Sequence, residues 1–176
     1  MGLSIRGSGA RVHVNVTSSM LDAGALEFRG GFGASSQILV VGSTLVTMSS
    51  YAIFFVKCTL GVNLTLLLLD NYIEGKSCAV YFFTGVVDGG GIIVKGNTLS
   101  TTEEDDGVES AARVYAVDVR NGGYFDVENN KMSAVSAIYL YGGTTVSSAG
   151  LLRVADCTFV CSTDFLIPRW CIWTAL

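Results

Sequence analysis

The chain has 176 residues, of which 50% are hydrophobic and 15% charged, and its formal net charge is −4. A disordered chain is excluded, because disorder requires few aliphatic residues and a high net charge. A collagen-like helix is excluded because the 21 glycines follow no period of three and proline occurs once. The acidic balance leaves no basic face for nucleic acid or anionic lipid as partners.

The hydrophobic content is not arranged as a membrane span. The longest uncharged run, 30–56, is interrupted by serines, threonines and glycines, and the dense apolar run 64–69 is too short to cross a bilayer. The N-terminal residues lack the basic start and apolar block of a secretory signal. We therefore expect no membrane span within this chain.

Instead, an apolar burst, a small or polar pair and one large apolar residue recur along the chain. The copies are 14–20 (the weakest), 38–45, 66–73, 92–99, 125–132 and 152–159. A second block, a small residue followed by an apolar-x-apolar triplet, recurs in step at 25–28, 52–55, 79–82, 116–119 and 137–140. Glycine-rich or small-residue turns follow at 88–91, 121–123 and 148–150. Blocks that repeat together at a period of about 27 residues predict a repeat architecture.

The repeats have the composition of short strands. They are rich in Val, Ile, Leu, Phe and Tyr, and Gly, Asn, Asp and Ser divide them. One unit cannot bury its apolar face alone, so neighbouring units must stack. The prediction is all-β: a right-handed parallel β-helix of the pectin-lyase-like type, with about six coils of roughly 27 residues. The solenoid is expected over 1–160, with a weak first coil at 1–30, an acidic insertion at 101–110 and an irregular tail at 161–176.

Asn71, Asn97 and Asn130 share one position of the repeat. The other copies carry Ser18, Ser43 and Cys157 there. An inward asparagine at a coil corner can bond to the coils above and below it, which predicts an asparagine ladder. The alternative is a set of exposed turn residues that tolerate a left-handed backbone. The alanine that opens the second block is expected to mark an inward, tightly packed position.

Four motifs resemble one known family. They are TLGVNLTLLLLDN (59–71), VDGGGIIVKGNT (87–98), VRNGGYFDVENN (119–130) and GLLRVADC (150–157). They are similar to the dispersed gene family surface proteins of trypanosomes, and the resemblance covers roughly 30–160. It implies an internal fragment of a very long, repeat-rich surface or secreted protein with no established enzymatic mechanism. It also implies a cell-surface or extracellular location, adhesion to host matrix protein or carbohydrate, and contact with neighbouring coils of a longer parent protein.

Because β-helices often cleave acidic polysaccharides, the carboxylates are candidate catalytic groups. The run 103–106, with Glu109, is expected to be a solvated loop tip, and a calcium site at 103–109 lacks EF-hand spacing. Asp88, Asp118 and Asp126 are scattered one per coil and are expected on an outer face. The only histidine, His13, cannot assemble a triad or a histidine-based metal site, and we expect it to be a partly exposed strand residue.

The cysteines at 58, 78, 157, 161 and 171 do not have zinc-site spacing, although Cys157 and Cys161 could pair as a disulfide in an oxidising compartment. Two sequons make Asn15 and Asn63 candidate N-glycosylation sites, and Asn63 is favoured because it precedes a strand burst. No catalytic, cofactor-binding or metal-ligating residue is predicted, and no cofactor is expected.

The leading hypothesis is a non-enzymatic surface β-solenoid for display and adhesion. Its repeated aromatic residues either line an elongated outer face or, for the inward half, stack in the core: Phe54, Phe55, Tyr81, Phe82, Phe83, Tyr139 and Tyr141. One alternative is an active or degenerate polysaccharide lyase or hydrolase. Another is a truncated fragment with no independent function.

Overall fold

The structure is a computed structural model that describes residues 2–22, 25–48, 50–102, 109–134, 136–147, 149–161 and 172–174. The described residues form strands, turns and bends, stacked as a parallel β-solenoid, as predicted. The strands lie at six levels, here called coils, and complete about five turns of roughly 27 residues. The described residues contain no helix long and apolar enough to cross a bilayer.

Each coil contributes one strand to each of three sheets. Sheet A stacks β1 (Leu3–Ser8), β4 (Leu26–Phe32), β7 (Tyr51–Leu60), β10 (Cys78–Asp88), β13 (Ser110–Arg120) and β16 (Ser136–Tyr141), and β17 (Thr145–Val146) also pairs with β13. Sheet B stacks β2 (His13–Thr17), β5 (Gln37–Val41), β8 (Thr65–Leu69), β11 (Gly91–Lys95), β14 (Tyr124–Glu128) and β18 (Leu151–Ala155). Sheet C stacks β3 (Met20–Asp22), β6 (Thr44–Val46), β9 (Tyr72–Gly75), β12 (Thr98–Thr101), β15 (Lys131–Ala134) and β19 (Thr158–Cys161).

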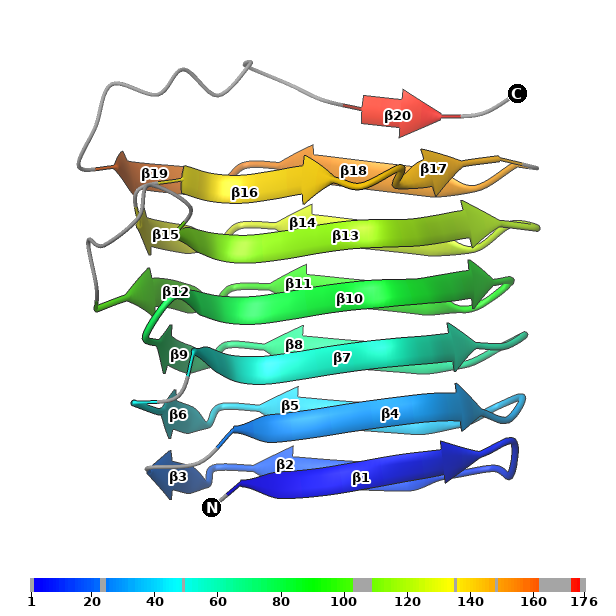
Figure 1. The fold of residues 1–176 in the computed structure, drawn as a ribbon, viewed down its shortest axis with the longest axis horizontal. Coiled ribbons are helices and arrows are strands. Elements are labelled where there is room, and N and C mark those ends of the chain that lie inside the picture. Colours follow the sequence, from blue (N-terminus) through cyan, green and yellow to red (C-terminus); the bar gives the residue numbers. More distant parts are fainter. Residues whose placement is uncertain are drawn as a thin grey trace.

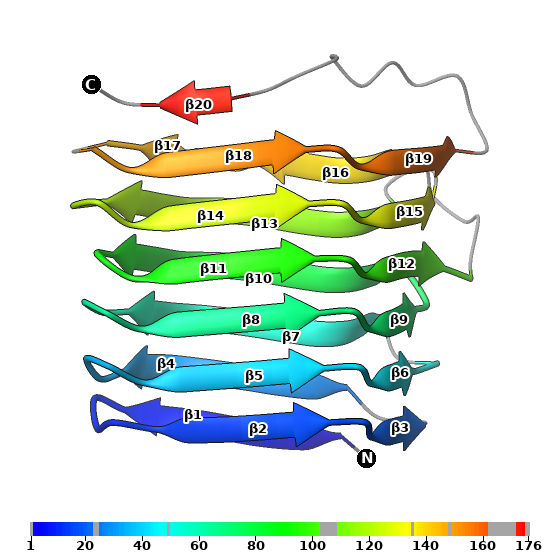
Figure 2. The same ribbon diagram turned by 180° about the vertical axis from the view of Figure 1, so that it is seen from behind.

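The coil is right-handed, as predicted. In Figure 1 the chain runs from left to right along sheet A in front, returns behind along sheet B, and climbs from bottom to top. Figure 2 shows the same path from the other side, with sheet B in front. The segment expected to be an irregular tail contributes one further strand, β20 (Ile172–Thr174), which pairs antiparallel with β18.

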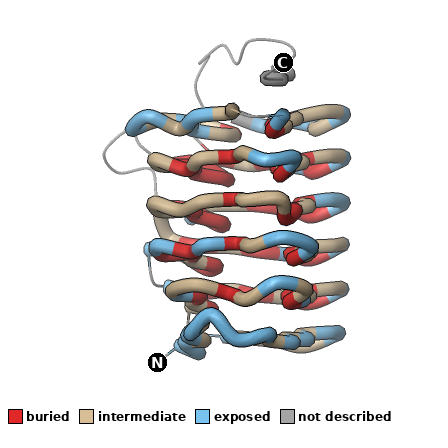
Figure 3. Tube along the Cα trace, turned by 90° about the vertical axis from the view of Figure 1, so that its right-hand side faces the viewer, coloured by how far each residue is buried: buried red, intermediate tan, exposed pale blue. Residues whose placement is uncertain are grey.

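Alternate residues of every sheet point inward and form one continuous core. In sheet B, Ile38, Leu66, Ile92, Phe125 and Leu152 stand directly above one another, which is the predicted register of the first block. Figure 3 shows that burial is greatest in the middle coils and lowest in the first. Stacking therefore buries the faces that one unit leaves open.

Two predicted registers are wrong. In the first coil Leu21, not Met20, aligns with Leu45. The error arises because the copy predicted at 14–20 has one residue fewer than the other copies. Met20 points outward and is 74% exposed. In β13 the alanine that aligns with Ala79 is Ala111, five residues before Ala116. β13 has apolar alternation on both sides of Ala116, so the period of two alone fits either register.

A residue with a left-handed backbone turns the chain from sheet B toward sheet C in every coil. The six residues are Ser18, Gly42, Asp70, Gly96, Asn129 and Asp156, with φ between 46° and 70°. At position 96 a Cβ would lie 2.1 Å from Oδ1 of Asp70 in the coil below, so a side chain there would require the Asp70 carboxylate to move. A second left-handed column, at Gly30, Lys57, Thr84 and Ala116, bends sheet A midway along its strands.

Candidate functional site

The structure brings Asn71, Asn97 and Asn130 into one buried column at the corner between sheets B and C. The backbone N–H of Asn97 donates to Oδ1 of Asn130 at 2.9 Å, and the N–H of Asn71 donates to Oδ1 of Asn97 at 2.9 Å. The Asn97 side-chain amide donates to the carbonyl of Leu68 at 2.8 Å and to Oδ1 of Asn130 at 3.0 Å. All three asparagines are at most 3% exposed, so they serve the coil corners and offer no surface to a ligand.

Serines continue this column toward the N-terminus. The N–H of Ser43 donates to Oδ1 of Asn71 at 2.9 Å, and the N–H of Ser19 donates to Oγ of Ser43 at 3.1 Å. The predicted member Ser18 is instead the left-handed residue before this position, an error that follows from the short first copy. At the other end, Nδ2 of Asn130 lies 3.8 Å from Sγ of Cys157, a weak contact that ends the column.

Cys58, Cys78 and Cys157 carry free thiols. Cys157 is free, so the disulfide with Cys161 that its spacing allowed is not formed. Burial raises the pKa of the Cys58 and Cys78 thiols to about 12, which keeps them protonated and unreactive at neutral pH. Cys171 lies outside the described residues, and for Cys161 only the backbone is described.

Both predicted glycosylation sites present their asparagine to solvent. Asn63 is exposed in the turn before β8 and has a φ of 57°, while Asn15 is exposed in the middle of β2. His13, also on β2, is exposed as well. The backbone N–H of Asn63 donates to the carbonyl of Gly89 in the next coil, so the turn is held while the side chain stays outside.

The acidic run 103–106 lies outside the described residues, but Glu109 does not belong to a solvated loop tip. Glu109 is 2% exposed, which corrects the prediction. Its position explains the burial, since it directly precedes β13 and its carbonyl accepts a hydrogen bond from the N–H of Ser136 in β16. Glu109 is therefore buried because its backbone continues the sheet A pairing of β13.

One arginine, Arg120, bridges two carboxylates near the turn between sheets A and B. Arg120 lies 3.1 Å from Asp88 through Nη2 and 3.4 Å from Asp118 through Nη1. The hydrogen bond from Asn121, together with Arg120, lowers the pKa of the Asp88 carboxyl. A general acid requires the opposite shift, so Asp88 is poorly suited to protonate a leaving group.

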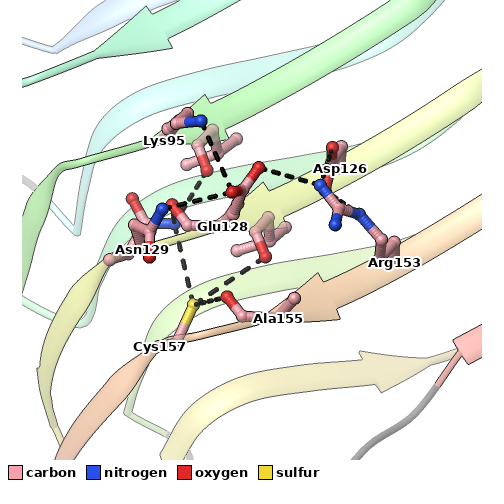
Figure 4. A network of polar contacts seen from close by, with 10 residues as sticks. Lys95, Asp126, Glu128, Asn129, Arg153, Ala155 and Cys157 are labelled. Carbon is pink, nitrogen blue, oxygen red and sulfur yellow. Dashed lines mark hydrogen bonds and ion pairs between the residues drawn. The ribbon is translucent and has the colours of Figure 1, made fainter.

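A second charged network covers the upper outer face of sheet B (Figure 4). Arg153 donates to both oxygens of Asp126, at 2.9 and 2.7 Å, and to Oε2 of Glu128 at 2.8 Å. Lys95 lies 3.4 Å from Oε1 of Glu128. Desolvation alone would raise the pKa of the Glu128 carboxyl, but Lys95 and Arg153 outweigh it and lower that pKa. Lys95 and Arg153 therefore favour the ionised form of Glu128.

Within the described ranges, no three His, Cys, Asp or Glu side chains are grouped so that they could hold a metal ion. Most of these ion pairs link strands of neighbouring coils. Asp126 and Arg153, for example, face each other in the register of β14 and β18, whereas Asp118 and Arg120 lie on the same strand, β13.

The aromatic residues divide between the core and the outer face of sheet A. Phe55 and Phe82 point inward, and Phe55 stacks on Phe28 and on Phe82 with ring centroids 4.8 and 4.5 Å apart. The outward rings form a continuous cluster, here called the aromatic band: Tyr51, Phe54, Tyr81, Phe83, Tyr115, Tyr139 and Tyr141. Tyr51 and Tyr115 are not among the aromatic residues predicted from the sequence. The wrong register of β13 hid Tyr115, which stands opposite Phe83 and Tyr141.

The aromatic band crosses four coils without a gap between rings. Successive centroids lie 4.6 to 5.6 Å apart from Tyr51 to Tyr139. The phenol oxygens of Tyr81 and Tyr141 are 2.7 Å apart, and burial together with this hydrogen bond raises the pKa of Tyr81. Exposure rises from 5% at Tyr81 to 41% at Tyr139, so the inner rings support the outer ones.

No family model matches the chain, and no curated protein is significantly similar to it. The resemblance to the trypanosome dispersed gene family therefore rests on the four motifs alone.

Proposed function

We propose that this solenoid is a non-enzymatic binding segment of a surface or secreted protein and that it adheres to carbohydrate or host matrix protein. The observation that carries the proposal is the aromatic band. A parallel solenoid needs apolar side chains inside, and its fold does not require rings on an outer face. Sheet C illustrates this, because its outer positions are mostly polar, among them Thr44, Thr98, Ser100, Lys131 and Ser133.

Carbohydrate fits this surface best. Tyrosine offers a rigid apolar face and a polar hydroxyl, so a row of tyrosines can stack on the C–H faces of sugars while hydrogen-bonding their hydroxyls. The rings hold one another by contact, as in the stacked pair Phe83 and Tyr115 with an interplanar angle of 9°. Little side-chain entropy is then lost on binding. The motif resemblance and the two exposed sequons support a cell-surface or extracellular location in this proposal.

The experiment is a binding screen against glycans and matrix proteins with a matched pair of variants. Tyr139 in the band is 41% exposed, and Tyr72 on sheet C is 39% exposed. We expect Tyr139→Ala to weaken binding about tenfold, or about 1.4 kcal/mol, and Tyr72→Ala to leave it unchanged. Equal effects of the two substitutions, or no binding to any glycan or matrix protein, would contradict the proposal.

A polyuronate cleavage assay run beside the screen tests the enzymatic alternative. The Asp88–Asp118 and Asp126–Glu128 pairs are each bridged by an arginine, so neither has a free acid and base for glycosidic chemistry. Release of unsaturated or reducing ends by the purified chain would favour a lyase or hydrolase instead.

A further inference from the structure

We infer that Asn121 is a site of spontaneous deamidation and that the product breaks the link between Asn121 and Asp88 of the coil below. Asn121 is the only asparagine of the chain that precedes a glycine, Gly122. Both residues are exposed at the turn between β13 of sheet A and β14 of sheet B. The modification involves neither the aromatic band nor a bound ligand.

The reaction needs only these two residues and water. A base removes the proton from the backbone nitrogen of Gly122, and this nitrogen attacks Cγ of Asn121. The new N–Cγ bond closes a five-membered succinimide ring, while the Cγ–Nδ2 bond breaks and Nδ2 takes up a proton and leaves as ammonia. Water then opens the ring. Attack at Cγ gives aspartate, and attack at the backbone carbonyl gives isoaspartate, in which the main chain runs through the side chain.

The turn leaves the attacking nitrogen accessible. The N–H of Gly123 donates the hydrogen bond that closes the turn, to the carbonyl of Arg120 at 2.8 Å, so this bond does not involve the N–H of Gly122. A Cβ at position 122 would meet nothing within 4 Å, so the turn has room to rearrange. Asn121 and Gly122 have φ of 52° and 75°, and glycine readily permits the change of backbone angles that ring closure requires.

Asp88 holds the reacting side chain. Nδ2 of Asn121 donates to Oδ1 of Asp88 at 2.6 Å, and Arg120 contacts Oδ2 of the same carboxylate at 3.1 Å. Ring closure breaks the first of these bonds, because Nδ2 departs as ammonia. A carboxylate in place of the amide would face Asp88 with a like charge and without a proton to donate. We therefore expect Asp88 to slow the reaction and the product to weaken the contact between the fourth and fifth coils.

Asn63 is a matched control within the chain. It is exposed, has a φ of 57° and lies in the corresponding turn two coils below. The next residue, Leu64, is 1% exposed, and its N–H donates to the carbonyl of Gly61 at 3.1 Å. The nitrogen that would attack Asn63 is therefore held by a hydrogen bond and by a buried side chain.

The test is incubation of the purified chain at neutral and at mildly alkaline pH, followed by proteolysis and mass spectrometry. We expect OH to replace NH₂ at Asn121 at least about tenfold faster than at Asn63, because glycine offers no Cβ to hinder ring closure. The rate should rise with pH, since a base must remove the Gly122 proton. A sample digested without incubation sets the background. Conversion of Asn121 no faster than that of Asn63, or a rate that falls as pH rises, would overturn the inference.

Variants test the role of Asp88. Asp88→Ala should speed the conversion of Asn121, whereas Asn121→Gln should prevent it, because the longer side chain would have to close a six-membered ring. Asn121→Asp carries the aspartate product and should lower the urea midpoint, and Asn63→Asp should leave the midpoint unchanged. Slower conversion in Asp88→Ala, or equal midpoints for the two aspartate variants, would contradict the assigned link between Asn121 and Asp88.

Discussion

The amide of Asn97 connects three consecutive coils, since it serves Leu68 and Asn71 on one side and Asn130 on the other. We predict that Asn97→Ala lowers the free energy of unfolding by about 2–4 kcal/mol, because several buried backbone groups lose their partners. Urea denaturation measures this change. Asn15→Ala, in an exposed strand position, is the control and should change stability by less than about 0.5 kcal/mol. Equal losses in the two variants would show that the column does not stabilise the corners.

Glu128 makes stability depend on pH. Its folded-state pKa lies below the ordinary value of 4.5, so its contribution is present above about pH 5 and is lost as pH falls through the lowered pKa. We expect Glu128→Gln to flatten the fall of the urea midpoint between about pH 5 and pH 3. Parallel pH profiles for the variant and the wild type would mean that Lys95 and Arg153 do not favour the ionised carboxylate.

The sequence predicted which residue types form the column at the corner between sheets B and C, but it predicted their exact positions less well. The shared repeat position of Asn71, Asn97 and Asn130 indicated an inward column from the sequence alone. The first coil was placed one residue out of register, because a serine pair fits either the left-handed position or the column. Sequence composition does not separate two adjacent small polar residues, whereas backbone φ does.

At the scale of the element, β13 offers a test of its register. Ala111 is fully buried and points into the core, whereas Ala116 has a φ of 50° in the sheet A bend. We predict that Ala116→Gly is neutral or stabilises the fold by up to about 1 kcal/mol, because glycine relieves the left-handed strain. Ala111→Gly should destabilise it by about 1 kcal/mol, since it adds backbone entropy and removes a buried methyl. The reverse order in thermal denaturation would restore the register first predicted from the sequence.

The aromatic band could not be predicted in full from the pattern of apolar residues within each strand. The alternation of apolar residues predicted the strands. It did not by itself show which aromatic residues face inward; the register of β7 and β10 shows that Phe55 and Phe82 do, while their neighbours face outward. Tyr115 escaped notice because β13 keeps its period of two on both sides of the left-handed residue. A surface that is assembled from several coils can be predicted only if the register of every strand is correct. The error of five residues in the predicted register of β13 therefore hid the aromatic band.

For the whole molecule, the first coil is the weak point. β1, β2 and β3 each end their sheet, so one edge of each strand is unpaired within the described residues. We predict that the isolated chain associates as concentration rises, which sedimentation velocity measures. Val14→Lys, which directs a charge inward at this edge, should weaken association. A monomer at every concentration would contradict this expectation.

The composition of the whole molecule follows from stacking. Each short coil contributes inward aliphatic side chains on three sides, while glycine, asparagine and serine turn the corners, so a high hydrophobic content arises without a membrane span. Fold class and period were therefore predictable from repetition alone. The binding surface was not, because a solenoid requires only an apolar interior and its outer residues follow no repeat.

Hydroxyl-radical footprinting tests the central proposal most directly, because each sheet carries its own tyrosine on the outer face. Tyr139 lies on sheet A, Tyr124 on sheet B and Tyr72 on sheet C. At saturation with a glycan or matrix protein that the binding screen identifies, we predict protection of Tyr139 and Tyr141 and unchanged oxidation of Tyr72 and Tyr124. Protection of Tyr72 or Tyr124 in place of Tyr139, or no protection anywhere at saturation, would contradict the assignment of ligand binding to the aromatic band.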